Sequence, residues 1–296
     1  MIENGKPIRD TAGEPVHAHG GCILEADGFW YWYGEDRRGD CYAACYRSQD
    51  LKNWERRGAI LTADTPCAPG TALRRPDGGK VNIERPKVLY SPKTKQYVLW
   101  AHYENGLDYH DAAACVAVSD KPDTGFVCRS IFRPLGNMSR DCTLFRDADG
   151  TVYFASASRD NADLKLYRLT DDLLSIQEEA ATLFPGEYRE APAFFFRDGQ
   201  YYLLSSHCTG WAPNQGGFSR ADKMDGVWSA IRDFGDETTY RSQPAFVLQL
   251  EDRYLYFGDR WMGGGDAYFT STYVILEIRF REDGSPYIEY TDRAPL

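Results

Sequence analysis

Five hairpin patterns recur along the chain and constrain its fold more than any other feature. In each, an apolar strand leads into a short polar turn and then into an aromatic-rich strand, as in antiparallel hairpins. The five segments are CILEADGFWYWYGE, KVLYSPKTKQYVLWAHY, TLFRDADGTVYFASAS, AFFFRDGQYYLLSS and AFVLQLEDRYLYFGDRW. Their apolar cores begin at Ile23, Val88, Leu144, Phe194 and Phe246. A spacing of roughly 50 to 65 residues is expected for propeller blades.

A weaker pattern of a strand, a polar turn and often a Trp or Phe follows each hairpin. Examples are ACYRSQDLKNWERRG, ACVAVSDKPDTGFVC and GGFSRADKMDGVWSA. Two hairpins per repeat make a four-stranded blade. Helical periodicity is scarce, and the best helix candidate is the short segment TDDLLSIQEEA. The sequence therefore predicts an all-β chain that forms one five-bladed β-propeller domain over residues 1–296. The alternative, a generic β-sandwich, would not require five equivalent hairpins.

A polar residue lies three or four positions before each apolar core. These residues are His19, Glu84, Asp141, Glu190 and Gln243. The first strand of each blade lines the central channel of a propeller, so equivalent strand starts form a ring at one mouth. The sequence therefore predicts that these five side chains, three of them acidic, converge at one end of the channel.

Carboxylates gathered in such a ring have a chemical consequence. Like charges in a partly desolvated cup cannot all ionise freely, so at least one pKa is expected to rise. A protonated carboxyl group beside an ionised one is what cleavage of a glycosidic bond needs. Arg85, Arg140 and Arg189 flank the three acids and either orient the carboxylates or neutralise the rim.

Three loops rich in aromatic and polar residues are expected near the same mouth: YWYGED, HCTGWAPN and GDRWMGGGDAY. Trp211 and Trp261 are candidates for stacking on a sugar ring, and Asn214 and Asp259 for binding its hydroxyls. Core filling is the alternative for each Trp. Because both lie among Gly, Pro and Asn, exposure on loops is favoured.

Composition excludes several other functions. A net charge of −10 argues against a nucleic-acid partner, which needs a basic face. No stretch approaches membrane-spanning length, and MIENGKPIRD at the start has no apolar core of a signal peptide. The eight cysteines are scattered without a CxxC pair. They predict reduced, mostly buried thiols in a cytoplasmic protein, with a secreted protein lacking its signal as the alternative.

No metal or cofactor is predicted. His17 and His19 are two residues apart and could share a metal only across a strand bend. The other histidines, His102, His110 and His207, show no ligand spacing. A serine nucleophile also lacks support, because no GxSxG segment occurs.

As a set, these motifs resemble the family-43 glycoside hydrolases, and within them the exo-β-1,3-galactanase branch. The resemblance rests on AHGGCIL with WYWYGE, IERPKVLY, MSRDCTLF, YREAPAFF, TGWAPN, SQPAFV and GDRW, which cover Ala18 to Trp261 in order, and TSTYVILEI continues it. It implies a five-bladed propeller that cleaves glycosidic bonds with inversion.

The resemblance also implies roles for single residues. Glu190 in REAPA is the expected general acid, and Asp141 in SRD the carboxylate that tunes its pKa. His19 in AHGG stands where the family ordinarily supplies a general base Asp. Gln243 in SQP faces the sugar where a base would act, and Glu84 in IERPK is a sugar-contacting acid and the other candidate base. The terminal sugar is expected to contact Glu35, Tyr109, Thr209, Trp211 and Asn214, and His19 is expected to take part in substrate binding.

The leading expectation is an inverting exo-β-1,3-galactanase that releases galactose from β-1,3-galactan or arabinogalactan oligosaccharides. An α-L-arabinofuranosidase or β-xylosidase is the second reading, against which the missing first-blade Asp argues. A carbohydrate-binding propeller without catalysis is the third. A pure lectin would have no need for the Glu190–Asp141 pair. No separate carbohydrate-binding module is expected.

Overall fold

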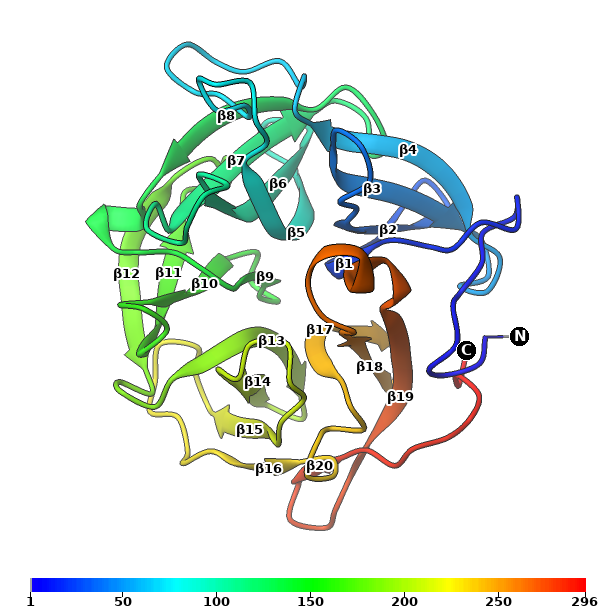
Figure 1. Cartoon of the computed structure of the whole chain (residues 1–296). Coiled ribbons are helices and arrows are strands. Elements are labelled where there is room, and N and C mark those ends of the chain that lie inside the picture. The colour runs from blue at the N-terminus through cyan, green and yellow to red at the C-terminus, as the bar shows by residue number, and fades with distance from the viewer. Residues whose placement is uncertain (1) are drawn as a thin grey trace.

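In the computed structural model, which describes residues 2–296, five four-stranded antiparallel sheets surround a central channel (Figure 1). The first blade contains β1 (His19–Ala26), β2 (Phe29–Glu35), β3 (Cys41–Ser48) and β4 (Glu55–Thr62). The second contains β5 (Asn82–Ser91), β6 (Gln96–Glu104), β7 (Ala113–Ser119) and β8 (Val127–Phe132). The third contains β9 (Cys142–Arg146), β10 (Val152–Ser158), β11 (Asp163–Leu169) and β12 (Ile176–Leu183).

The fourth blade contains β13 (Arg189–Arg197), β14 (Gln200–His207), β15 (Gly216–Ala221) and β16 (Arg232–Phe234). The fifth contains β17 (Gln243–Leu250), β18 (Arg253–Arg260), β19 (Thr272–Phe280) and β20 (Pro286–Tyr287). Two short 3-10 helices, η1 (Pro134–Gly136) and η2 (Gly265–Thr270), complete the described elements. Each blade runs outward in chain order from the strand that lines the channel. The predicted five-bladed propeller is confirmed.

Alternation along the strands explains how the blades pack. In β2, Tyr31 and Tyr33 face the second blade, whereas Trp32 between them faces the fifth. This is the period-two pattern of a strand buried on both faces. Five buried apolar clusters result, one between each pair of neighbouring blades. The core is therefore a ring of five inter-blade layers around the channel.

The ring closes through the start of the chain. Residues 2–5 lie between β19 and residues 291–294, and the two termini lie near each other in Figure 1. Asn4 is buried; its Nδ2 donates to the carbonyl oxygens of Ile275 and Thr291, both at 2.9 Å. Its Oδ1 accepts the Ile275 N–H at 2.7 Å. The Asn4 side chain thus makes hydrogen bonds to the edge of β19 that a neighbouring strand would otherwise make through its backbone.

Two local predictions were wrong. TDDLLSIQEEA is a turn followed by β12, because Thr170 Oγ1 bonds Asp172 and the backbone of Ser175 and builds a turn in place of a helix. In the fourth blade the outer strand is β16, so VWSA is a loop. Trp228 in that loop packs on Phe194 at a ring distance of 5.7 Å.

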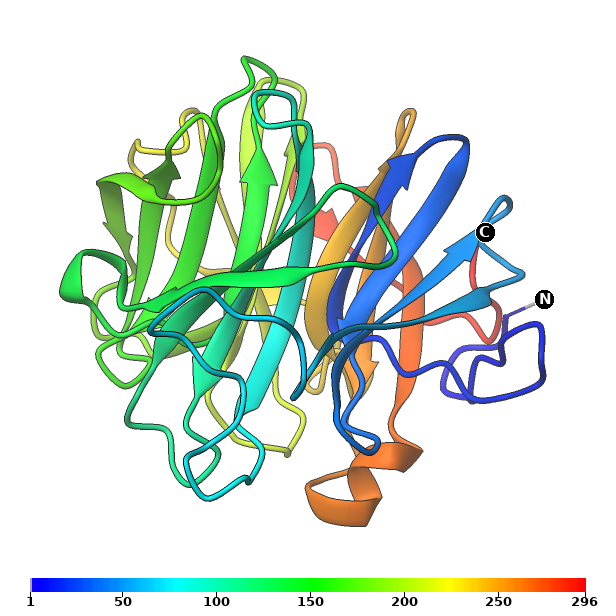
Figure 2. The same ribbon diagram turned by 90° about the horizontal axis from the view of Figure 1, so that it is seen from above.

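All eight cysteines are free thiols, and five of them are buried. Within residues 2–296, no helix has the length and apolar character needed to cross a membrane. Seen from the side, η2 and the β4–β5 loop project from one end of the channel (Figure 2).

Candidate active site

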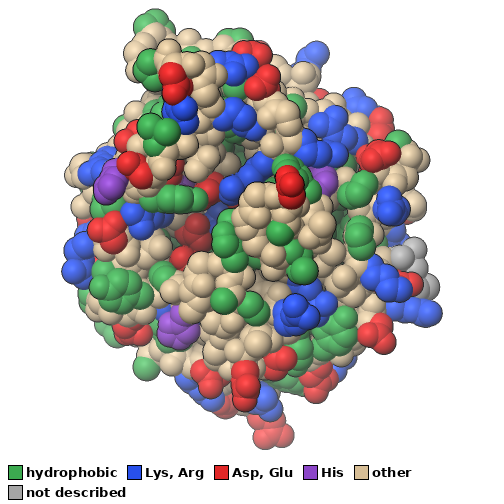
Figure 3. All heavy atoms as spheres, viewed as in Figure 1, with side chains coloured by type: hydrophobic (Ala, Val, Ile, Leu, Met, Phe, Trp, Pro, Cys, Tyr) green, Lys and Arg blue, Asp and Glu red, His purple; other side chains and the backbone are tan. Residues whose placement is uncertain are grey.

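Four of the five predicted ring residues meet at this end of the channel. Glu84 on β5, Glu190 on β13 and Gln243 on β17 line a cavity of about 310 Å³ together with Asp141, which immediately precedes β9. This face is hollowed near its centre, with acidic and basic side chains in the hollow (Figure 3). His19, the fifth residue, starts β1 but is fully buried outside the cavity.

Irregular strand starts aim these side chains. In β1, β5 and β13 the register shifts directly after the ring residue. The residue that follows has a left-handed φ: 59° at Gly20, 50° at Arg85 and 56° at Ala191. Such bulges re-aim side chains and are common beside active sites. At Arg85 and Ala191 this conformation costs about 1–2 kcal/mol each, so neighbouring contacts must hold it.

Those contacts are carboxylates of the preceding blade. The N–H groups of the three left-handed residues donate from Gly20 to Asp259 Oδ2 at 2.8 Å, from Arg85 to Glu35 Oε1 at 3.0 Å, and from Ala191 to Asp141 Oδ2 at 3.0 Å. Each bond joins two neighbouring blades. The carboxylates therefore fasten the ring while they shape the cavity.

Glu190 has the properties of a proton donor. Its pKa is raised to about 7, first by burial of the carboxyl group and then by the nearby carboxylate of Asp141. The charge of Arg85 and hydrogen bonds with Cys208 and Gln243 oppose this rise. Asp141 is in turn held by Arg85, whose Nε lies 2.7 Å from Asp141 Oδ2. A carboxyl group with a pKa near 7 is partly protonated at neutral pH, as a general acid must be.

Gln243 is fixed beside this acid by four hydrogen bonds. Its Nε2 donates to Glu190 Oε1 and Ser206 Oγ, both at 2.9 Å. Its Oε1 accepts from Arg85 Nη2 at 2.5 Å and from Trp261 Nε1 at 2.8 Å. Two donors at the oxygen and two acceptors at the nitrogen define the amide orientation and favour its ordinary carbonyl form. Gln243 is thus a neutral group that positions Glu190.

Glu84 and Glu35 share a cation on the other side of the cavity. Arg37 Nη2 donates to Glu84 Oε1 and to Glu35 Oε2, both at 2.9 Å, and Tyr109 Oη donates to Glu84 Oε1 at 2.7 Å. Burial opposes ionisation of Glu84. The contact and charge of His102, aided by Arg37 and Tyr109, nevertheless lower its pKa to about 2. Glu84 is therefore an ionised hydrogen-bond acceptor and a weak base. In contrast, burial raises the pKa of Glu35.

Aromatic side chains form one wall of the site. Trp211 and Trp261 both line the cavity, with ring centroids 5.6 Å apart in an edge-to-face arrangement. Tyr268 of η2 stacks on Trp261 at 5.8 Å. Trp211 is 43% exposed, so a flat aromatic face is open to a ligand, as sugar stacking requires.

Two predicted contacts in the Trp211 loop lie outside the cavity. Thr209 Oγ1 donates to the Ala212 carbonyl and accepts from Asn214 Nδ2, both at 2.6 Å. Asn214 also pairs with the backbone of His207. Thr209 and Asn214 lie outside this cavity, where their polar groups close the loop that carries Trp211, and Asn214 lines a small adjoining cavity with Trp211, Gln243 and Trp261.

His19 and Asp259 also lie behind the cavity. His19 Nδ1 is 2.9 Å from Asp259 Oδ1, and both side chains are at most 1% exposed. The His19 ring stacks on Tyr273 at 4.6 Å. Both were predicted to bind substrate, but the inter-blade bond to Gly20 and this stacking remove them from the open surface.

Comparison with known proteins matches this architecture to one enzyme family. A model of "Glycosyl hydrolases family 43" matches residues 20–286. The chain is 42% identical to an exo-β-1,3-galactanase from Clostridium thermocellum over 98% of its own length and 65% of that chain, with a TM-score of 0.90. The chain belongs to glycosyl hydrolase family 43.

Other family-43 structures agree. A β-1,3-galactosidase solved with galactodeoxynojirimycin is 32% identical, with 99% of each chain covered and a TM-score of 0.89. The exo-β-1,3-galactanase of Phanerochaete chrysosporium, solved with galactose, is 33% identical over 98% of this chain and 67% of its own, with a TM-score of 0.87. The family-43 chain thus spans only about two thirds of both galactanase chains. No curated protein matched it.

Sequence reasoning missed several residues of this family-43 cavity. Arg37 and Asn161 lie on loops, where no strand pattern marks them, and Asn161 Nδ2 lies 3.4 Å from Glu190 Oε2. His102 had a usable signal, because it is the cross-strand partner of Glu84 in the predicted hairpin. Extending the predicted pairing of this hairpin as far as Glu84 would have identified His102 as its neighbour.

The three flanking arginines take different roles. Arg85 holds Asp141 and Gln243. Arg140 lines the cavity and pairs with the exposed Asp160 at 2.8 Å. Arg189 turns away and donates to Ser205 Oγ at 3.0 Å and to the Ser205 carbonyl at 2.8 Å. Of these three arginines, only Arg85 orients an acid of the ring.

One group of side chains has the spacing of a metal site. Ligand atoms of Glu84, His102 and Asp141 all lie within 4.8 Å of one another. Arg37 and Arg85 already bind the two carboxylates, and a divalent cation there would meet both guanidinium charges. The donor set therefore fits a metal ion poorly.

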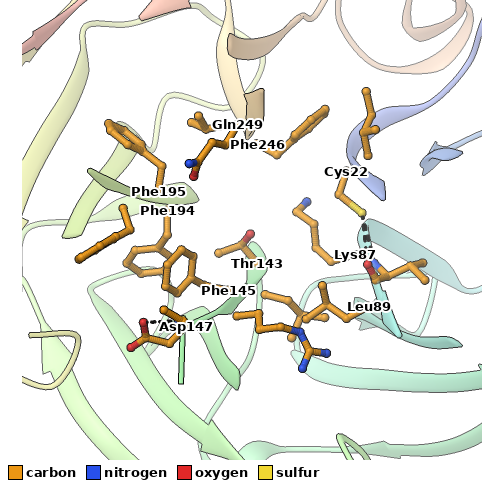
Figure 4. A pocket seen from close by; sticks show the side chains of 17 residues that line it. Cys22, Lys87, Leu89, Thr143, Phe145, Asp147, Phe194, Phe195, Phe246 and Gln249 are labelled. Carbon is orange, nitrogen blue, oxygen red and sulfur yellow. Dashed lines mark hydrogen bonds between the residues drawn. The ribbon is translucent and has the colours of Figure 1, made fainter. Parts of the chain in front are cut away.

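A second cavity of about 440 Å³ opens at the opposite end of the channel (Figure 4). Its walls are mainly apolar, including Phe145, Phe194 and Phe246. Lys87 reaches from it toward the ring end, donating to the Gly20 carbonyl. Asp147, the one carboxylate among its lining residues, accepts from Tyr201 Oη at 2.7 Å. The lining residues of this cavity thus lack the carboxyl pair found at the ring end.

Proposed function

We propose that this family-43 chain is an exo-acting β-1,3-galactanase that releases galactose from β-1,3-galactan or arabinogalactan oligosaccharides with inversion. The observation that carries the proposal is the Glu190–Asp141 pair in the cavity at the channel mouth. The linkage and sugar are supported by similarity to enzymes named exo-β-1,3-galactanase and β-1,3-galactosidase.

In the proposed reaction, Glu190 donates its proton to the glycosidic oxygen as the bond from the anomeric carbon to that oxygen breaks. A water molecule bonds to the anomeric carbon from the opposite face, and the proton that it loses passes to solvent, from which Glu190 is protonated again. Asp141 keeps that proton on Glu190 at neutral pH and is itself fixed by Arg85 and the Ala191 N–H. Gln243 Nε2 holds Glu190 Oε1 in place. The carboxylate left after proton transfer is then stabilised by the same Gln243 hydrogen bond and by the Arg85 charge.

The rest of the cavity binds the terminal sugar. Glu84 offers ionised oxygens to sugar hydroxyls, and Trp211 offers an aromatic face. Neither Glu84 nor Gln243 is a strong base, since the first has a pKa of about 2 and the second is a neutral amide. Both act on the sugar or the attacking water as hydrogen-bond partners.

The test is incubation with a panel of β-1,3-, β-1,4- and β-1,6-galactooligosaccharides, arabinan and xylooligosaccharides, followed by product analysis. Galactose released one unit at a time from the β-1,3 series alone supports the proposal. Arabinose or xylose as the main product assigns another family-43 activity. Binding of β-1,3-galactobiose without cleavage identifies a carbohydrate-binding propeller. Proton NMR of the first product supplies its anomeric configuration, which must be inverted.

A further inference from the structure

A buried histidine lies between two carboxylates behind the cavity. His102 is 1% exposed. Its Nδ1 is 3.3 Å from Glu84 Oε2, and its Nε2 is 2.8 Å from Glu104 Oε1. Glu104 is fully buried, and its second oxygen accepts the Ala112 N–H at 2.8 Å. The row Glu84–His102–Glu104 thus runs from the cavity wall into the second blade.

The two flanking carboxylates favour the charged state of this ring. A neutral imidazole carries one N–H and would present a lone pair to one of the two carboxylates. The doubly protonated ring donates from Nε2 to Glu104 and forms an ion pair with Glu84, whose Oε2 lies 3.3 Å from Nδ1 without the alignment of a hydrogen bond. Burial disfavours the charge, but the contacts and charges of Glu104 and Glu84 overcome it and raise the pKa of His102 to about 9. His17, a buried histidine without such partners, has its pKa lowered to about 4, chiefly by burial.

Few other groups face this ring. Arg140 Nε is 4.0 Å from Glu104 Oε1, and the Tyr109 ring centroid lies 5.9 Å from that of His102. Asp141 has a ligand atom within 4.8 Å of the pair Glu84 and His102. The Cys142 thiol donates to the Arg85 carbonyl at 3.7 Å, and burial raises the pKa of that thiol to about 12, so it stays neutral. Arg37 acts from the far side of Glu84. The two glutamates are therefore the direct partners of the ring nitrogens.

We propose that His102, held as an imidazolium by Glu104, is a positioning residue that keeps Glu84 ionised and oriented to accept hydrogen bonds from sugar hydroxyls. This assignment rests on the proposed function for its substrate, but the charge state of the row does not. Glu84 has two donors on Oε1, Arg37 and Tyr109, so without His102 its Oε2 would face an empty or neutral neighbour. A protonated Glu84 would donate where the sugar needs an acceptor.

The first experiment is independent of activity. The chain has five histidines, so two-dimensional ¹H–¹⁵N spectra of the imidazole rings can be assigned with His102→Gln. We expect both His102 nitrogens to stay protonated up to about pH 9, and Glu104→Gln to lower the titration midpoint by roughly one unit or more. A neutral His102 at pH 7 in the wild-type protein would overturn the proposal.

The second experiment measures the consequence for substrate. His102→Gln and Glu104→Gln should raise KM for β-1,3-galactobiose about tenfold with a much smaller change in kcat, the pattern of lost uniform binding. Glu104→Asp keeps the negative charge and should recover most of that loss, which a merely structural role would not predict. His17→Gln, at a buried histidine outside the cavity, is the matched control and should leave KM unchanged.

The pH profile separates the two proposals. Wild-type KM should be flat through neutral pH and rise above about pH 9, with the rise moved to lower pH in Glu104→Gln. An unchanged KM profile in that variant contradicts the positioning role. If wild-type protein releases no galactose while His102 still titrates near pH 9, the proposed function fails and the charged row stands.

Discussion

Replacing Asp141 by Asn should move the alkaline limb of the pH–rate profile to lower pH. The carboxyl group of Glu190 has a pKa of about 7, raised by burial and then by the charge of Asp141. Wild-type activity should therefore fall about tenfold per pH unit above pH 7, as the protonated acid disappears. Asp141→Asn removes the like charge and leaves the Arg85 guanidinium, 2.7 Å from Asp141 Oδ2, without its partner. Both changes favour ionised Glu190.

Burial persists in this variant, so the pKa should fall only part of the way to its ordinary value. A shift of roughly one unit equals about 1.4 kcal/mol. At pH 7 it reduces the protonated fraction from about a half to about a tenth, a rate loss of about fivefold from protonation alone, whereas at pH 5 this loss nearly vanishes. Any loss from disturbed geometry is the same at every pH, which separates the two effects.

The assay is kcat/KM for β-1,3-galactobiose between pH 4.5 and 8.5, which reports the free enzyme. Asp160→Asn is the matched control, because Asp160 pairs with Arg140 at the cavity rim and is exposed; its profile should follow the wild type. If the limb in Asp141→Asn stays at the wild-type pH or moves upward, the charge of Asp141 does not raise the pKa of Glu190 and the acid assignment loses its basis.

Three further outcomes are expected. Glu190→Gln removes the transferable proton and should lower kcat on β-1,3-galactobiose by roughly two to four orders of magnitude. The same variant should lose much less on a nitrophenyl galactoside, whose leaving group needs little protonation; full activity on galactobiose would refute Glu190 as the acid. Trp211→Ala should weaken substrate binding by about 1–3 kcal/mol, measured by calorimetry with a non-cleavable galactoside, because an exposed stacking face is lost; unchanged affinity would make Trp211 structural. Asn4→Ala leaves buried backbone groups of Ile275 unpaired and should lower the free energy of unfolding by about 1–3 kcal/mol in urea titrations, whereas the exposed Glu3→Ala should not.

Much of the cavity follows from local pattern. The five hairpins fix the blades because period-two alternation and short polar turns are properties of neighbouring residues. Once the blades are known, equal offsets before each apolar core place Glu84, Asp141, Glu190 and Gln243 around one mouth, where the structure has them. The chemistry of an acid beside a second carboxylate could therefore be predicted without coordinates.

The placement of the remaining polar side chains depends on a choice of partner. Thr209 and Asn214 have the groups to bind sugar hydroxyls, but each finds its partner within its own loop. Asp259 accepts a hydrogen bond from the Gly20 N–H of the next blade. Residue type limits what a polar group can bind, and it does not say which candidate will lie within reach.

The sequence by itself thus determined the fold and the strand that lines the channel, because these depend on spacing along one chain segment. The choice of Glu190 and Asp141 among the ring acids came from the resemblance to family 43. Only the tertiary structure decided that Arg85 would join Asp141 to Gln243, and that Arg37 would join Glu84 to Glu35. Both arginines connect residues of different blades, which are far apart in sequence. Their distances, and the pKa values that depend on them, are set when the ring closes and water is excluded from its mouth.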